Sequence, residues 1–460
     1  MTPGGGSGEE PTTRAGDPGL MLVGRLASLL FIHGQTTEGT RVAVRQVGEG
    51  LGRDLLLLDA HWGGLTISAD GPAADLRVPA TPLAIDMGMV GAAEALVAVV
   101  RARRVGAGEA LAALAAVERR PPVGLARFAA AAGLGAGALA VIFGATDVAT
   151  VALAAASAGA GAGLRRAASR LSGNPFLQPF LAALLAGMVT AAALALRLPA
   201  SANLVAACPC MVLVPGPHFL NGMLDLARAR IPLGAARLAF AGLIVAAICA
   251  GLLIGLSPEA AVLPAGGAAA PVPLTADGLA AGLAVIAYGS FFNMPWRTLP
   301  APVVVGVLAH ALRWELLARG ASVQSGAFVA CLFVGAVMTP VAHRFRLPFG
   351  GLAFASVVSL IPGLFMFRTA SGVMALLGEP GVASLAIVAN LLGDAATACV
   401  VLLAMTAGLL VPKMLLDGVA GFRSRGSAPR RGFGPVRPGD TDAAAAWCDR
   451  KPSGASRRAE

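Results

Sequence analysis

The chain has 460 residues, of which 56% are hydrophobic and only 13% are charged, and it carries a net charge of +10. Because soluble globular proteins have about 25% charged residues, this composition excludes an ordinary soluble protein and predicts a polytopic α-helical membrane protein. The arginines lie mostly in short connections and in the C-terminal segment. The positive-inside rule places them there, so we interpret the charge as membrane topology and predict no nucleic-acid partner.

The pattern of the first 122 residues predicts a tail followed by a small cytoplasmic α+β domain. Residues 1–19 are polar, rich in Gly and Pro, and lack a basic-then-apolar signal pattern, so we expect a disordered cytoplasmic tail. Residues 20–122 combine helical spacing with short strand patterns. Thr36 or Thr37 is a candidate N-cap for a second helix, and Gly63-Gly64 predicts the turn between two strands.

From Phe128 onward, apolar runs of the length that a bilayer helix needs follow one another. The predicted spans are 128–144, 147–164, 176–196, 202–222, 236–256, 276–293, 301–317, 323–341, 349–367 and 385–411. Arginine is concentrated in the connections on the side of the N-terminal domain and is sparse on the other side. This asymmetry fits ten spans with both termini in the cytoplasm. The membrane that we expect is the plasma membrane of a bacterium.

The ten spans divide into two sets of five, residues 126–256 and 274–416, in which the same motifs recur in the same order. Each set has an Arg-Leu-Pro, beginning at Arg197 or Arg346, and a Pro-Gly inside its fourth span. An odd number of spans per set makes the second set enter the membrane from the opposite side, which predicts two inverted five-helix repeats. The remaining segment, 417–460, is basic and rich in Gly, Ser and Pro; we expect a disordered tail that lies against anionic lipid.

The two Pro-Gly breaks predict a substrate site. Proline removes a backbone donor and glycine lets the chain turn. The helix that resumes presents free N–H groups suited to a carboxylate. Asn221 and Asp225 share one helix face after the first break, although Asp225 could also be a solvated residue at the inner end of its span. The predicted substrate-binding residues are Asn203, Pro215, Gly216, Asn221, Asp225, Ser359, Pro362, Gly363 and Arg368.

Other acidic residues inside the predicted spans are candidates for carrying a coupling proton. Asp394 lies deep in the last span with Asn390 on the same face, and Asp147 lies where the second span begins. A structural, hydrogen-bonding role for Asp394 is the alternative. Cys208 and Cys210 resemble the Cys-Pro-Cys of copper pumps, but the sequence shows neither the phosphorylated Asp motif nor the large ATP-binding domains of such pumps, nor a GxxxxGK[ST] loop. We therefore predict neither a metal nor a cofactor.

Several stretches resemble the threonine/serine exporters. In the first half these are LLFIHGQTTEGTRVAVRQVGEGLG, IDMGMVGAAEALVAVV and LVPGPHFLNGMLDLARARIPLGAARLAFAGLI; in the second half they include GLAVIAYGSFFNMPWRTLPAPVVVGVLAHALRW and FVACLFVGAVMTPVAHRFRLPFGGLAFASVVSLIPG. In some relatives the two halves are separate proteins, and here they resemble a fused form. The resemblance implies export, driven by the proton motive force, of small hydrophilic metabolites: threonine and serine, or a dicarboxylate as in the split relatives.

Three functional hypotheses stay open at this point. The first is a proton-coupled exporter whose partners are a small amino acid or dicarboxylate, protons and membrane lipid. The second is a membrane-anchored enzyme or sensor that acts through residues 20–122, and the third is a metal transporter that uses Cys208 and Cys210. The residues favour the first, which makes the chain a transporter and not an enzyme. They leave open whether it forms a homo-oligomer.

Overall fold

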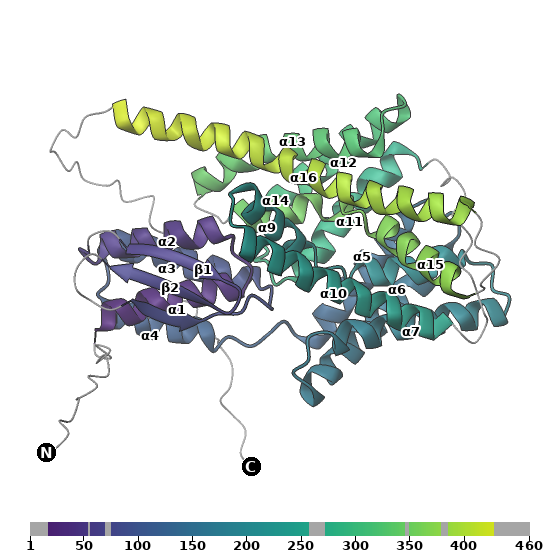
Figure 1. The fold of residues 1–460 in the computed structure, drawn as a ribbon, viewed down its shortest axis with the longest axis horizontal. Helices are drawn as coiled ribbons and strands as arrows, with labels where there is room; N and C mark the ends of the chain where they lie inside the picture. The colour runs from purple at the N-terminus through teal and green to yellow at the C-terminus, as the bar shows by residue number, and fades with distance from the viewer. Residues whose placement is uncertain are drawn as a thin grey trace, which may run out of the picture. The chain divides into compact units, whose positions relative to one another are not determined.

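A computed structural model of the chain describes residues 17–53, 56–69, 75–256, 272–345, 349–378 and 385–426. Figure 1 shows its helices and strands in chain order. The predicted N-terminal tail through residue 16, the second Arg-Leu-Pro (346–348), Cys448 and the segment 427–460 lie outside the described residues.

The N-terminal elements are helices packed beside a small antiparallel sheet. They are α1 (Pro18–Ile32), α2 (Thr37–Gly50), β1 (Leu56–His61), β2 (Gly64–Ala69), β3 (Leu76–Pro79), α3 (Met87–Arg101) and α4 (Ala107–Glu118). The strands pair in the order β1-β2-β3, and α1 and α2 contact the sheet. Thr36 caps α2 by accepting a hydrogen bond from Gly39 N at 3.0 Å, which confirms the predicted N-cap.

The first series of apolar helices follows these elements. It consists of α5 (Leu125–Ile142), α6 (Val148–Leu171), α7 (Leu177–Ala195), α8 (Ala202–Met211), α9 (Gly216–Ala227) and α10 (Ile231–Leu256). The pair α8 and α9 is bent by 60° at a short break. The break begins after Met211, inside the predicted span 202–222, because Pro215 and Gly216 interrupt the helix there.

The second series has the same order of long helices and one bent pair. It consists of α11 (Leu274–Phe291), α12 (Pro300–Ala318), α13 (Val323–Phe345), α14 (Phe349–Val357), η2 (Val358–Leu360), α15 (Gly363–Gly378) and α16 (Leu385–Gly426). A bend of 55° separates Phe349–Leu360 from Gly363–Val373. The described part of α16 continues to Gly426. The sequence analysis predicted a disordered tail from residue 417, and the structure corrects this start because the helix continues past it.

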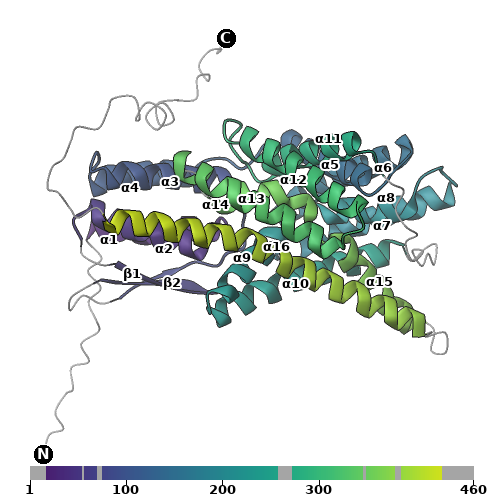
Figure 2. The ribbon, with the colours of Figure 1, turned by 90° about the horizontal axis from the view of Figure 1, so that it is seen from above.

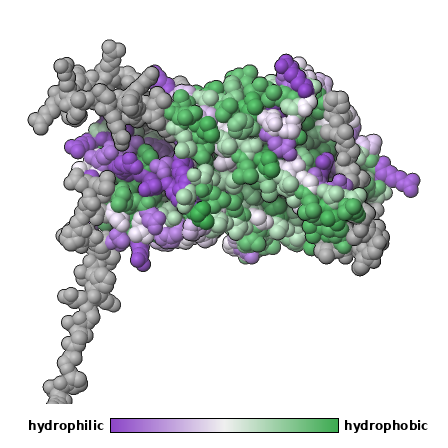
Figure 3. All heavy atoms as spheres, turned by 45° about the horizontal axis from the view of Figure 1, so that its top comes forward, coloured by the Kyte–Doolittle hydropathy of each residue, from purple (hydrophilic) through white to green (hydrophobic). Residues whose placement is uncertain are grey.

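Many of these helices are suited to a lipid environment. Among the described residues, eight helices are long and apolar enough to cross a membrane, and the number reaches ten if each bent pair is one span. Their outward side chains include large hydrophobic residues, such as Leu243, Leu279 and Leu308, each more than half exposed. On the face in Figure 3, hydrophobic residues gather over these helices and hydrophilic ones over the N-terminal elements. The chain is a multi-pass membrane protein.

Glycines bring the third and fifth helices of each series into backbone contact. A Cβ on Gly251 of α10 would lie 2.2 Å from Phe180 O of α7, and one on Gly255 would lie 2.3 Å from Leu184 O. In the second series, a Cβ on Gly335 of α13 would lie 2.9 Å from Leu409 O of α16. Figure 2 shows α16 beside α13. Small residues permit this close approach of membrane helices.

We expect Gly251→Ala to destabilise the protein, because the added methyl group meets backbone that cannot turn away. Overpacking of this kind costs about 1–3 kcal/mol. Thermal unfolding in detergent, followed by fluorescence, measures the effect. Gly242→Ala is the matched control, since Gly242 lies on the same helix with open space around its Cβ position. Equal melting temperatures for the two variants would contradict the proposed tight contact between α7 and α10.

Candidate functional site

The first break lies between α8 and α9. Pro215 has no backbone N–H with which to continue the helix, and Gly216 N donates instead to Val214 O at 2.8 Å. Gly216 begins α9 at a place where no side chain fits, because a Cβ there would lie 2.4 Å from Ile361 Cδ1. The glycine therefore allows the close approach of Ile361 and Phe354 from the other interrupted helix, which a larger residue would displace.

The second break has the reciprocal contact. Gly363 N donates to Ile361 O at 2.8 Å, and a Cβ on Gly363 would lie 3.1 Å from Met211 Cγ, at the end of α8. The two breaks therefore meet. The side chains at this contact are apolar: Ile361, Phe354 and Met211 pack in one hydrophobic cluster. The breaks support each other by packing, and no ion pair joins them among the described residues.

The predicted polar residues of the first break face the N-terminal elements. Asn221 is buried and its Nδ2 donates to Gly34 O at 3.2 Å. Arg368, which follows the second break, instead packs over the ring of Phe365 at 5.9 Å. Asn221 and Arg368 thus have separate surroundings in this conformation.

Asp225 lies at the centre of a buried charged cluster. Its carboxylate accepts a hydrogen bond from Thr37 Oγ1 at 3.0 Å and one from Arg230 Nη1 at 3.3 Å. Arg237 Nε lies 3.3 Å from Asp225 Oδ2, and both side chains are almost fully buried. The Arg237 guanidinium also lies 4.8 Å from the ring centroid of Phe31 in α1. The alternative that Asp225 is a solvated residue is therefore wrong, because its carboxylate is buried and compensates a buried arginine.

Glu38 extends this cluster to the start of α2. Arg230 Nη2 donates to Glu38 Oε2 at 2.6 Å, so one arginine joins Glu38 and Asp225. Partial burial raises the pKa of the Glu38 carboxyl, but the hydrogen bond and charge of Arg230, with Arg41 and Arg228 nearby, outweigh it and lower the pKa below its ordinary value. Glu38 therefore stays ionised and holds α2 to the connection between α9 and α10.

The N-terminal elements also contact the second series of helices. Asn293, in the turn after α11, donates to the Asp86 carboxylate at 3.1 Å, and Met87 N donates to Phe292 O at 2.8 Å. A Cβ on Gly350 of α14 would lie 3.0 Å from Thr36 Cγ2. The loop before α2 and the start of α3 thus join both halves of the membrane part on one side.

Gln35 and Glu94 fix this loop from within the N-terminal elements. Gln35 is buried; its Nε2 donates to Glu94 Oε1 at 2.7 Å and its Oε1 accepts from Thr36 N at 2.8 Å. Burial raises the pKa of Glu94, and the Gln35 hydrogen bond only partly offsets this effect. The loop is thereby held in one conformation next to α9.

A chain of buried polar side chains adjoins the second break. His310 of α12 lies with Nδ1 3.1 Å from Asp277 Oδ2 and with Nε2 2.8 Å from Ser359 Oγ. With Asp277 ionised, Nδ1–H donates to the carboxylate and Nε2 accepts from the Ser359 hydroxyl. All three side chains are buried. Ser359 was a predicted site residue, whereas sequence reasoning missed Asp277 and His310, although titratable residues in two apolar runs were an available signal.

The other predicted residues lie farther from the contact between the breaks. Asp147 caps α6 by accepting from Thr150 N at 2.6 Å, and Asn203 lies in the first turn of α8. Asp394 is half-buried in α16, where it experiences the charge of Arg368, and Asn390 is exposed.

The cysteine pair of α8 is buried in the hydrophobic cluster around the first break. Cys208 and Cys210 are free and fully buried there. In the part of the chain that the structure describes, no group of three or more His, Cys, Asp or Glu side chains is arranged to hold a metal ion. A soft-metal site needs several such ligands, so the residues around this pair give no support to metal transport.

Two family models match the chain, one in each half. The ThrE model, for threonine/serine exporters, matches residues 21–258, and a second model, described as "Threonine/Serine exporter, ThrE", matches residues 277–415. The first match covers the N-terminal elements and the helices to α10, and the second covers the described helices from α11 into α16. No solved structure matches the chain.

We expect Asp225→Asn to destabilise the fold, because it leaves Arg237 buried beside a neutral amide. Removal of one partner of a buried ion pair costs about 3–5 kcal/mol. Thermal unfolding of the purified protein in detergent measures the loss. Glu315→Gln is the control, since its ion pair with Arg319 is exposed and such pairs contribute about 0–1 kcal/mol. If both variants melted together with wild type, Asp225 would not be the compensating charge.

We expect Glu38→Gln to change the pH dependence of stability. Because folding lowers the pKa of Glu38 below its ordinary 4.5, its contribution is fully present above pH 4.5 and is lost as the pH falls below that value. Melting temperatures measured on both sides of pH 4.5 should therefore fall less steeply at the acid end in the variant. Glu49→Gln is the control, since its carboxylate is exposed and 3.9 Å from Arg101 Nε. Parallel curves for wild type and Glu38→Gln would contradict the link to Arg230.

Proposed function

We propose that this chain, which belongs to the threonine/serine exporter family, exports threonine, serine or a similar small hydrophilic metabolite and is driven by the proton motive force. Members of this family are membrane transporters, so the chain is a transporter and not an enzyme. The observation that carries the proposal is the direct contact between the two Pro-Gly breaks. Interrupted helices that meet within a helical bundle are how many secondary transporters build a substrate site.

The pattern of contacts supports two inverted five-helix repeats. Corresponding helices pack in corresponding ways: α5 with α6 as α11 with α12, and α6 with α8 as α12 with α14. The first helices of the two series, α5 and α11, also contact each other, as do the bent pairs through α9 and α14. Both series use glycines to bring their third and fifth helices together. A pseudo-two-fold axis between the halves accounts for all of these contacts.

The connections that we predict to be cytoplasmic should all lie on the same side of the membrane. Contacts near the N-terminal elements support this arrangement. Arg166 Nη2 donates to Val123 O at 2.6 Å, Arg230 pairs with Glu38, and Asn293 binds Asp86. Arg166 lies near the end of α6, Arg230 lies between α9 and α10, and Asn293 lies in the turn after α11. On the other side, Ser201 N donates to Thr150 Oγ1 at 2.7 Å. The proposed orientation places both termini in the cytoplasm of a bacterial cell.

Two sets of titratable residues are candidates for the coupling proton. Asp394 is half-buried in α16 near Arg368. The buried chain Asp277–His310–Ser359 adjoins the second break, and histidine is the residue whose charge changes most readily near neutral pH. The second set is closer to the contact of the breaks, because Ser359 lies directly before the turn into α15. A proton bound there would alter the hydrogen bond that ties α12 to this turn.

Export of labelled threonine from loaded vesicles tests the proposal. We expect export to fall to the passive rate when an uncoupler dissipates the proton gradient. Export should likewise fall toward the passive rate in His310→Gln or in Asp394→Asn, whichever of the two removes the residue that carries the proton. Cys399→Ser, at an exposed position of α16, is the control with an unchanged rate.

Three results would contradict parts of this proposal. Export that persists with the uncoupler would exclude the proton motive force as the driving force. Export of labelled succinate without threonine export would favour the dicarboxylate alternative. Full export by both His310→Gln and Asp394→Asn would exclude both residues as the coupling site. The assignment of the exported substrate would then still stand.

A further inference from the structure

A polar pocket lies where the N-terminal elements meet the membrane helices. Its volume is about 250 Å³, far more than one water molecule needs. Its walls come from the segment before α3, from α5, α6 and α7, and from the end of α11. The polar side chains that line it are Asp86, Arg165, Arg166, Ser169, Gln178 and Asn293.

Arg165 has a positive charge that no protein carboxylate compensates. Among the described residues it forms no ion pair and no hydrogen bond, and its Nε is buried without a hydrogen-bond partner. Its guanidinium lies 5.7 Å from the ring centroid of Phe128 and 5.5 Å from that of Phe291. The two aromatic rings hold the guanidinium in place but leave its N–H groups available. A guanidinium in this state is suited to a carboxylate, which it binds with two parallel hydrogen bonds.

Arg166 strengthens the positive charge at the same place. One of its N–H groups donates to Val123 O at 2.6 Å, and its guanidinium lies 5.2 Å from the ring centroid of Phe128. Neither contact neutralises it. Two adjacent arginines repel each other, so an anion bound between them would relieve a repulsion that the protein alone leaves in place.

The same pocket contains one carboxylate. Asp86 accepts hydrogen bonds from Met89 N at 2.9 Å and from Asn293 Nδ2 at 3.1 Å. These neutral donors hold it in position, and it forms no ion pair with any basic residue that the structure describes. Asp86 is therefore available for a cationic group such as an ammonium. A ligand with a carboxylate and an ammonium matches the pocket, whereas a second carboxylate would be repelled by Asp86.

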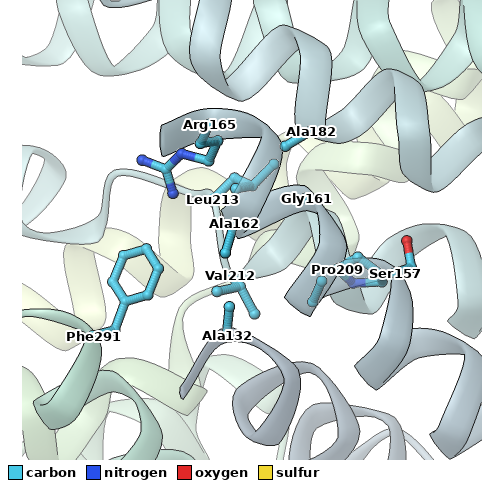
Figure 4. Close-up of a pocket in the computed structure, with 11 residues that line it drawn as sticks. Ala132, Ser157, Gly161, Ala162, Arg165, Ala182, Pro209, Val212, Leu213 and Phe291 are labelled. Atoms are coloured by element: carbon cyan, nitrogen blue, oxygen red, sulfur yellow. The ribbon is translucent and has the colours of Figure 1, made fainter. Parts of the chain in front are cut away.

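Arg165 and Phe291 also line a narrow space that leads toward the first break. This space has a volume of about 10 Å³ and is bounded by Pro209, Val212 and Leu213 of the α8–α9 segment. Figure 4 shows Arg165 and Phe291 at one end of it and Ser157 with Pro209 at the other. The Ser157 hydroxyl is buried and has no hydrogen-bond partner in the described structure. In this conformation the space is too narrow for a metabolite. A metabolite bound in the larger pocket therefore could not pass on to the first break.

We propose that this pocket is the loading site of the transporter and that it binds a zwitterionic α-amino acid, with the carboxylate on Arg165 and Arg166 and the ammonium on Asp86. This inference rests on the proposed export function and assigns its substrate class. It selects the amino acid over the dicarboxylate that the family resemblance left open. Arg165 and Phe291 then separate the loading site from the broken helices, so the substrate moves on when the narrow space widens.

Binding of labelled threonine and labelled succinate to the purified full chain in detergent tests the assignment, because it needs no proton gradient. We expect wild type to bind threonine more tightly than succinate. Arg165→Gln should weaken threonine binding about ten- to hundred-fold, the loss expected for hydrogen bonds to a charged group. Asp86→Asn should weaken threonine binding and narrow the preference for threonine over succinate.

Two further variants make the result interpretable. Arg170→Gln removes an exposed arginine from the same helix outside the pocket and should bind threonine as wild type does. Arg165→Lys keeps the charge but loses the planar fork, so its affinity should lie between those of wild type and Arg165→Gln. Melting temperatures of all variants identify any that unfold. If Arg165→Gln unfolds, the threonine affinity of Arg165→Lys is compared with that of wild type instead.

The outcomes separate this inference from the proposed function. If wild type binds and exports threonine while Arg165→Gln, Arg165→Lys and Asp86→Asn bind it equally well, the loading site is wrong and the export function stands. If wild type binds succinate more tightly than threonine, the zwitterion assignment is overturned. If wild type neither binds nor exports threonine, the proposed function itself fails.

Discussion

The arrangement of the site depends on one buried charge pair, Asp225 with Arg237. An arginine as fully buried as Arg237 is costly without an opposite charge, and the carboxylate that compensates it in turn needs its own hydrogen bonds. Thr37 supplies one of these and Arg230 another, and Arg230 also reaches Glu38. The pair therefore fixes α9, α10 and the start of α2 to one another. Because α9 begins at the first break, the position of the N-terminal elements and the position of the break are set by the same cluster.

The two breaks and the proposed loading site have different roles in the proposed transport cycle: the breaks pack through apolar side chains, and the loading site provides the polar groups. The breaks meet through apolar side chains, which leaves little room between them. The uncompensated polar groups lie elsewhere, in the pocket lined by Arg165 and Asp86. If this pocket is the proposed loading site, a substrate bound there would remain on the side of the N-terminal elements until the helices of the first break move. Since Arg165 borders both the pocket and the narrow space beside the break, substrate binding and helix movement would be coupled through one side chain.

Sequence reasoning identified the interrupted helices but not the partners of their polar side chains. It placed Asn221 and Asp225 on one face of the helix after the first break, which helical geometry requires, and both indeed face the N-terminal elements. It could not show that Gly34 and Thr37 lie opposite them, because those residues are nearly two hundred positions away along the chain. Arg165 was interpreted as a residue of positive-inside topology, a role that any loop arginine shares. Only its lack of a carboxylate partner distinguishes it, and such a lack is visible only in three dimensions.

The sequence by itself determined the class of protein, the series of apolar helices, the two interruptions and the family. These features follow from local chemistry: hydrocarbon demands long apolar helices, and Pro with Gly breaks a helix wherever it occurs. The tertiary structure decided which residues compensate which charges. It paired Asp225 with Arg237, joined Asp277 to Ser359 through His310, and left Arg165 without a partner. The reason is that electrostatic compensation depends on distance in space and on burial, and neither quantity is encoded in the spacing of residues along one helix.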